Sequence, residues 1–208
     1  MNIKLILIVV LIIALGGFFL FKTNNGGKTM AEVSNHKVLV AYFSRTGEQY
    51  SVGNITEGNT AIIAKMIAEK TNGDLFEIKV KNDNYPKSYT ALTEYAQQEK
   101  RNNARPEIIG NVENFDDYDT IFIGYPNWWG DMPMPVYTFI ESYDFTGKNV
   151  VPFCTHEGSG LSGTQNKVQN AAKGAKLLTG FAIYGHTAQN DRTEADKKVS
   201  EWLKGIGF

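Results

Sequence analysis

The sequence predicts an α/β fold: a doubly wound, five-stranded parallel sheet with helices on both faces. The unbroken apolar run at residues 38–43 and the largely apolar segments at 120–125 and 149–154 are typical of strands that are buried on both faces. Segments with a helical spacing of apolar residues lie between the predicted strands, as in βαβ units. A chain of 208 residues that is 42% hydrophobic is also large enough to bury one substantial core.

The composition excludes several classes of function. The formal net charge of −1 offers no basic surface for nucleic acid. The single cysteine, Cys154, excludes an intramolecular disulfide and a structural zinc site built from cysteines. We interpret Cys154 as a small buried apolar residue at the end of a strand.

The N-terminal segment differs from the rest of the chain. Residues 5–21 carry no polar side chain and lie between Lys4 and Lys22. As a helix they would extend about 26 Å, enough to cross most of a hydrocarbon core. A cleaved signal peptide usually has a shorter apolar region, and no convincing cleavage site follows Phe21. We therefore interpret residues 1–22 as a transmembrane anchor or uncleaved signal segment, with a buried soluble helix as the less favoured alternative.

This interpretation sets the expected domain organisation. Residues 23–35 are rich in glycine and asparagine and are predicted to be a flexible linker, so the folded domain would comprise residues 36–208. The protein would be anchored in a membrane by a single N-terminal span. Lysines flank the span on both sides, so the sequence leaves open which side the domain occupies.

The first half of the domain is predicted from local patterns. After the strand at 38–43, a helix is expected from Ala61 to about residue 71, with Asn59 and Thr60 as caps. Residues 75–80 alternate apolar and charged side chains, as a strand nearer a sheet edge would. Between residues 85 and 105, Tyr89 and Tyr95 belong to a stripe at helical spacing that we interpret as packing.

The second half alternates more regularly. Strands are predicted at residues 120–125, 149–154 and 176–184, and helices at 136–143, 164–173 and 192–203. In such a sheet, ligands bind at the carboxyl ends of the strands. The segments that follow the strands at 38–43, 120–125 and 149–154 are therefore expected to form one site.

The segment after the first strand has the composition of a phosphate site. Its hydroxyls and glycines are followed by a helix, whose N-terminus favours an anion; the residues concerned are Ser44, Thr46, Gly47, Asn59 and Thr60. Arg45 is the one cation in the three segments, and the G-K-[ST] ending of a triphosphate loop is missing. A single phosphate therefore fits better than two or three.

Three motifs together resemble the flavodoxin family. They are S-R-T-G…N-T after the first strand, G-Y-P-N-W-W-G after the third and F-C-T-H-E-G-S-G at the fourth. The resemblance extends over almost all of residues 36–208 and implies a sheet of order 2-1-3-4-5 with bound FMN. The uninterrupted segment at 176–184 resembles the short-chain members. Residues 48–58 depart from the pattern, because they are an insertion that divides the usual contiguous phosphate loop.

The resemblance also implies which residues bind FMN. Ser44, Thr46, Asn59 and Thr60 would hold the phosphate, and Arg45 and Gly47 would shape the turn. The isoalloxazine ring would lie between two loops, one formed by Pro126, Asn127, Trp128, Trp129 and Gly130, and the other by Thr155, His156, Glu157, Gly158 and Ser159. At least one tryptophan is expected to contact the ring. His156 could contact it or be a solvated loop residue, and Glu157 and Asp131 would place negative charge near it.

Three functions remain open at this stage. The favoured one is an electron carrier tethered to a membrane, which would exchange electrons with a redox partner protein or a small-molecule acceptor. The alternative is an FMN-dependent oxidoreductase of the NAD(P)H:quinone type; the sequence shows no second nucleotide site, which favours the carrier. A receiver domain of the same fold would need paired carboxylates after the first strand, where Ser44 and Arg45 stand instead.

Overall fold

A computed structural model describes residues 37–208 of the chain, so the predicted anchor at residues 1–22 and the predicted linker at residues 23–35 lie outside the described residues. The central sheet is entirely parallel, and its order is β4-β1-β5-β6-β7, with β8 also paired to β6. Its strands are β1 (Val38–Tyr42), β4 (Asp74–Glu77), β5 (Thr120–Pro126), β6 (Asn149–His156), β7 (Lys176–Leu177) and β8 (Phe181–Tyr184). The predicted fold class and the strand order 2-1-3-4-5 are thus confirmed.

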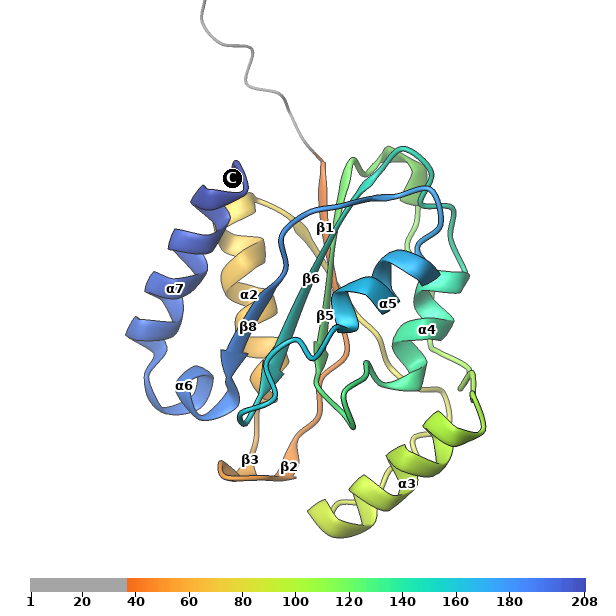
Figure 1. The fold of residues 1–208 in the computed structure, drawn as a ribbon, viewed down its shortest axis with the longest axis vertical. Helices are drawn as coiled ribbons and strands as arrows, with labels where there is room; N and C mark the ends of the chain where they lie inside the picture. The colour runs from red at the N-terminus through yellow and green to blue at the C-terminus, as the bar shows by residue number, and fades with distance from the viewer. Residues whose placement is uncertain (1–36) are drawn as a thin grey trace, which may run out of the picture. The chain divides into compact units, whose positions relative to one another are not determined.

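Helices cover both faces of the sheet (Figure 1). They are α2 (Asn59–Thr71), α3 (Tyr89–Arg101), α4 (Met134–Glu141), α5 (Thr164–Ala171), α6 (Gly185–Asn190) and α7 (Arg192–Gly205), with a 3₁₀ turn η1 (Phe115–Asp117). Alternate residues of β1 enter different cores: Val38 and Val40 pack with α2 and α7, whereas Leu39 and Ala41 pack with α4 and α5. This is why the apolar run of β1 is continuous, since both faces are buried.

One predicted strand is wrong in detail. Residues 176–184 do not form a continuous strand but divide into β7 and β8, with residues 178–180 between them. The break lies opposite Pro152 of β6, because β7 pairs with β6 up to Val150 and β8 pairs from Phe153 onward. Proline has no N–H to donate to the ladder, which explains the interruption.

The insertion at residues 48–58 contains a β-hairpin. Its strands, β2 (Gly47–Gln49) and β3 (Gly53–Ile55), form a separate antiparallel sheet. Figure 1 places this hairpin beyond the carboxyl end of β1. The next helix begins at Asn59, earlier than predicted, and its cap position is occupied by Gly58. Neither Asn59 nor Thr60 caps it with a side chain.

Within residues 37–208, no helix is both long enough and apolar enough to cross a bilayer. The predicted membrane segment at residues 5–21 is outside the described part of the chain and remains a prediction.

Candidate functional site

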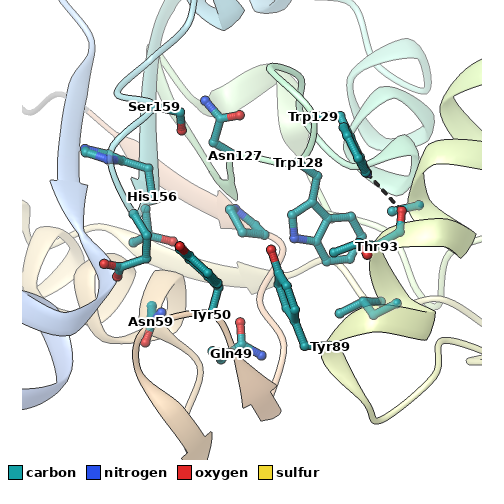
Figure 2. A pocket seen from close by; sticks show the side chains of 15 residues that line it. Gln49, Tyr50, Asn59, Tyr89, Thr93, Asn127, Trp128, Trp129, His156 and Ser159 are labelled. Carbon is teal, nitrogen blue, oxygen red and sulfur yellow. Dashed lines mark hydrogen bonds between the residues drawn. The ribbon is translucent and has the colours of Figure 1, made fainter.

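A pocket opens at the carboxyl edge of the sheet, where the three predicted loops meet (Figure 2). Nine of the sixteen predicted site residues line it: Asn59, Pro126, Asn127, Trp128, Trp129, Thr155, His156, Glu157 and Ser159. The other seven do not: Ser44, Arg45, Thr46, Gly47, Thr60, Gly130 and Gly158. The structure therefore brings together most of the two predicted ring loops but little of the predicted phosphate turn.

The loop after β5 is a tight turn. The N–H of Trp128 donates to the carbonyl of Asp131 at 2.9 Å, and the N–H of Asp131 donates back at 3.0 Å. Trp129 and Gly130 have φ values of 57° and 66°. Positive φ at both central positions defines a type I′ turn, and glycine meets this requirement at the second of them without strain. Gly130 therefore shapes the pocket through its backbone.

Buried charge holds this turn from behind. The Asp131 side chain is 8% exposed, and its Oδ2 lies 2.6 Å from Lys167 Nζ and 3.6 Å from Lys100 Nζ. The same ammonium groups donate to the turn carbonyls, Lys100 to Trp129 O at 2.6 Å and Lys167 to Gly130 O at 3.2 Å. Asp131 does not line the pocket. Its charge is compensated by two lysines, so the expectation that it charges the ring environment is not met.

The two tryptophans have different surroundings. Trp128 packs edge to face against Phe43 and Tyr85, with centroids 5.5 and 5.7 Å apart. Trp129 is 52% exposed, and its indole N–H donates to the carbonyl of Thr93 at 2.9 Å. Trp128 is thus both a core residue and a pocket wall, whereas Trp129 covers the surface between the turn and α3.

The loop after β6 is also ordered by internal hydrogen bonds. His156 Nδ1 accepts from the N–H of Gly158 at 2.9 Å, which leaves Nε2 as the protonated nitrogen of the neutral ring. Burial lowers the pKa of His156 below its usual 6.5, partly opposed by the charge of Glu157. Glu157 accepts from the N–H of His186 at 2.8 Å and pairs with its Nδ1 at 2.7 Å. Thr155, the residue before the last one of β6, is buried, and its hydroxyl is hydrogen-bonded to Thr60 Oγ1 at 2.8 Å.

The predicted phosphate turn is occupied largely by structural contacts. Ser44 Oγ accepts from the N–H of Ala61 at 3.1 Å, so its hydroxyl completes the N-terminus of α2. Arg45 pairs with Asp83 at 2.6 Å and lies over the ring of Tyr85. Gly58 allows this close packing, since a Cβ there would stand 2.1 Å from Ser44 Oγ.

The first turn of α2 keeps donors for a ligand. Within residues 37–208, the N–H groups of Asn59 and Thr60 donate to no protein acceptor. Asn59 lines the pocket, and Gln189 Nε2 donates to its Oδ1 at 2.9 Å, which leaves its amide group fixed in place. Backbone donors with a helix dipole behind them suit an anion.

Sequence reasoning missed six pocket residues: Gln49, Tyr50, Tyr89, Leu92, Thr93 and Ala96. The first two belong to the insertion, and the others to α3. The interpretation of the α3 stripe as packing is correct for Tyr95, which contacts Tyr85, but incomplete for Tyr89, which lines the pocket. A tyrosine within the insertion was the available signal, but a loop sequence does not specify which way it folds.

The chain was compared with known proteins. Residues 37–204 match a family model described as Flavodoxin. A protein from Bacteroides uniformis, provisionally assigned as a flavoprotein, is 31% identical with a TM-score of 0.63, covering 81% of this chain and 98% of its own. A similarly assigned protein from Bacteroides eggerthii is 29% identical with a TM-score of 0.65, covering 83% and 98%.

A more distant structure has the same fold. A flavoprotein from Lactobacillus acidophilus, determined in complex with FMN, is 23% identical with a TM-score of 0.57, covering 78% of this chain and 98% of its own. The search of curated proteins found no significant match.

Proposed function

The chain belongs to the flavodoxin family, and we propose that it binds FMN in the pocket at the carboxyl edge of the sheet and transfers electrons through it. The observation that carries this proposal is that the Trp128–Asp131 turn, the loop after β6 and the open first turn of α2 meet around one pocket. Bound FMN supplies an electron acceptor and donor that amino-acid side chains lack.

The residues present fit the chemistry of FMN. A flat apolar ring favours aromatic walls, which Trp128 and Tyr89 provide. The polar edge of the ring needs fixed donors and acceptors, and Asn127 is held for this by its own bonds to Gly130 N and Gly160 O. A single phosphate needs neutral donors at a helix N-terminus, which the N–H groups of Asn59 and Thr60 provide.

The residues of the pocket walls are also fixed in orientation, and His156 is fixed in its protonated nitrogen. The type I′ turn fixes the backbone of the aromatic wall, and Asp131 and Met132 at its end are buried. His156 keeps its proton on Nε2 because Nδ1 accepts from Gly158, so it would act as a neutral donor at the rim. Glu157 lines the pocket, and the direction of its carboxylate is fixed by two hydrogen bonds to His186.

Titration of the purified full-length chain with FMN tests the binding. Quenching of flavin fluorescence should saturate at one FMN per chain, and riboflavin should bind more weakly because it lacks the phosphate. Equal affinity for the two ligands would contradict the assignment of the α2 N-terminus. A chain that does not bind FMN at all would contradict the proposal as a whole.

Electron transfer requires a separate test. The chemically reduced protein should pass electrons to a one-electron acceptor such as cytochrome c, and it should not oxidise NAD(P)H by itself. Rapid NAD(P)H oxidation in the presence of a quinone would identify an oxidoreductase of the quinone-reductase type instead of a carrier.

We propose further that residues 5–21 tether this domain to a membrane. Support comes from the sequence alone: 17 consecutive residues without a polar side chain between two lysines. The chain should then sediment with membranes and resist extraction by carbonate. Recovery in the carbonate-soluble fraction would contradict the tether.

A further inference from the structure

The insertion reaches the pocket through two residues, Gln49 and Tyr50. Both line it, although the hairpin that carries them is not part of the central sheet. Gln49 is the last residue of β2, and Tyr50 begins the turn that leads to β3. Figure 2 shows Tyr50 beside Tyr89, on the side of the pocket opposite the Trp129 turn. The insertion therefore supplies a wall that the sheet and its own loops do not.

Two contacts with the start of α3 fix this wall. Glu48 Oε2 accepts from the N–H of Tyr89 at 2.8 Å, where a carboxylate also stabilises the positive end of the helix dipole. The rings of Tyr50 and Tyr89 are stacked, with centroids 5.6 Å apart and planes inclined by 28°. These contacts with α3 hold the hairpin in its position at the pocket.

Gln49 carries an unmet hydrogen bond. Among residues 37–208, three buried side-chain nitrogen or oxygen atoms lack a partner: Arg45 Nε, Gln49 Nε2 and Thr138 Oγ1. Of these residues, Gln49 is the one that lines the pocket. A buried amide without a partner destabilises the fold, and it is retained at functional sites where a ligand supplies the partner. Nε2 can only donate, so the missing partner is an acceptor.

Tyr50, the next residue, exposes a large aromatic ring instead of burying a polar atom. It is 58% exposed, one of the most exposed large apolar side chains of the described chain, and it stands at the mouth of a pocket. Single exposed aromatic residues are ordinary, but one that is already stacked on a second pocket residue offers a flat face to a flat ligand. A planar ligand with oxygen atoms would supply an acceptor for Gln49 Nε2 and would cover the exposed ring of Tyr50.

We propose that the β2–β3 hairpin is part of the FMN site, with Gln49 Nε2 donating to an oxygen of the cofactor and the Tyr50 ring covering it. This inference rests on the proposed function. It assigns the insertion a task, which is to replace with an amide donor and an aromatic cover what the divided phosphate turn no longer provides. Ser44, Arg45 and Thr60 are engaged elsewhere, by Ala61, Asp83 and Thr155.

The substitution Gln49→Leu tests the proposal because it should weaken FMN binding without destabilising the FMN-free chain. Removing an unpaired buried amide should leave the melting temperature of the FMN-free chain unchanged or raise it. Removing a donor to the cofactor should raise the Kd for FMN about tenfold. Tyr50→Leu should raise the Kd several-fold. Both are measured on the full-length chain by calorimetry and by quenching of flavin fluorescence.

Asn54→Leu is the matched control. Asn54 pairs with Glu48 across the same hairpin, is exposed and does not line the pocket. The same change from an amide to an aliphatic side chain should therefore leave the Kd unaltered. The proposal is overturned if Gln49→Leu keeps the wild-type Kd, or if it weakens binding only as far as it destabilises the FMN-free chain. A wild-type chain that does not bind FMN would overturn the proposed function itself, before any variant is made.

Discussion

The two sides of the pocket are built in different ways. The Trp128–Asp131 turn is held from behind by a carboxylate that is 8% exposed and by two ammonium groups that bond to the turn carbonyls. The β2–β3 hairpin is held by one exposed hydrogen bond and one ring stack, and it keeps an unpaired amide. The first wall is complete without a ligand, whereas the second is completed by one.

The comparison predicts that the largest loss of stability follows from removing Asp131. Asp131→Ala would leave Lys167 and Lys100 without their shared partner and would release the hydroxyl of Tyr137, which donates to Asp131 at 3.0 Å. We expect unfolding to become easier by about 3 kcal/mol, measured by urea denaturation of the FMN-free chain.

Asp117→Ala is the control for that change. Asp117 pairs with Lys37 at 3.2 Å, but its side chain is 60% exposed. An exposed pair contributes about 0–1 kcal/mol. Equal losses of stability for Asp117→Ala and Asp131→Ala would show that the Asp131 carboxylate does not hold the turn.

The two tryptophans of the turn should differ in how much stability their removal costs. Trp128→Ala removes packing against Phe43 and Tyr85 and should cost about 2 kcal/mol of stability, as well as FMN affinity. Trp129→Ala removes a half-exposed ring with one indole bond and should cost less than about 1 kcal/mol. Chemical denaturation and FMN titration of both variants check this order. A greater loss for Trp129→Ala would reverse the assignment of core and surface.

A substitution that loosens the β2–β3 hairpin should change the stability of the fold only slightly. Glu48→Gln removes the charge at the start of α3, which is worth about 0.5 kcal/mol at an exposed helix N-terminus. Hydrogen exchange should become faster in the first turn of α3 and remain unchanged in the Trp128–Asp131 turn. Faster exchange in both walls would mean that they form one cooperative unit, which would contradict the claim that the two walls are held independently.

The smallest effect is a dependence on pH. The pKa of His156 in the folded chain is lowered by burial, so the unfolded chain binds this proton more readily. The stabilising contribution is therefore present above the usual pKa of 6.5 and is lost as the pH falls below it. His156→Gln should reduce the loss of stability between pH 7 and pH 5.5. An unchanged pH profile would mean that the ring is not desolvated.

The sheet could be predicted because its residues report their surroundings locally. Residues 38–43 are apolar without interruption because both faces of β1 are buried, and the strand order follows once the family resemblance is seen. The break opposite Pro152 was missed because it depends on pairing between β6 and its neighbour. A proline affects the partner strand as much as its own, which the sequence of residues 176–184 cannot report.

The site was harder to predict for the same reason. Asn127 and Trp128 follow β5 directly and His156 is the last residue of β6, so the strand ends place all three at the pocket. Arg45 was expected to shape the phosphate turn, but a carboxylate 38 residues away determines its position. Gln49 and Tyr50 were unpredictable as pocket residues because their direction depends on a hairpin register and on a contact with α3.

Both walls can be observed in one experiment, an NMR titration of the ¹⁵N-labelled full-length chain with FMN. The account predicts that the side-chain NH₂ signal of Gln49, identified by its loss in Gln49→Leu, and the indole N–H signal of Trp129 shift together and saturate at one FMN per chain. The indole signal of Trp202, which donates to Thr179 and packs against Phe181, should remain in place. Shifts confined to Trp129, with the Gln49 signal unmoved, would contradict the claim that the hairpin completes the FMN site.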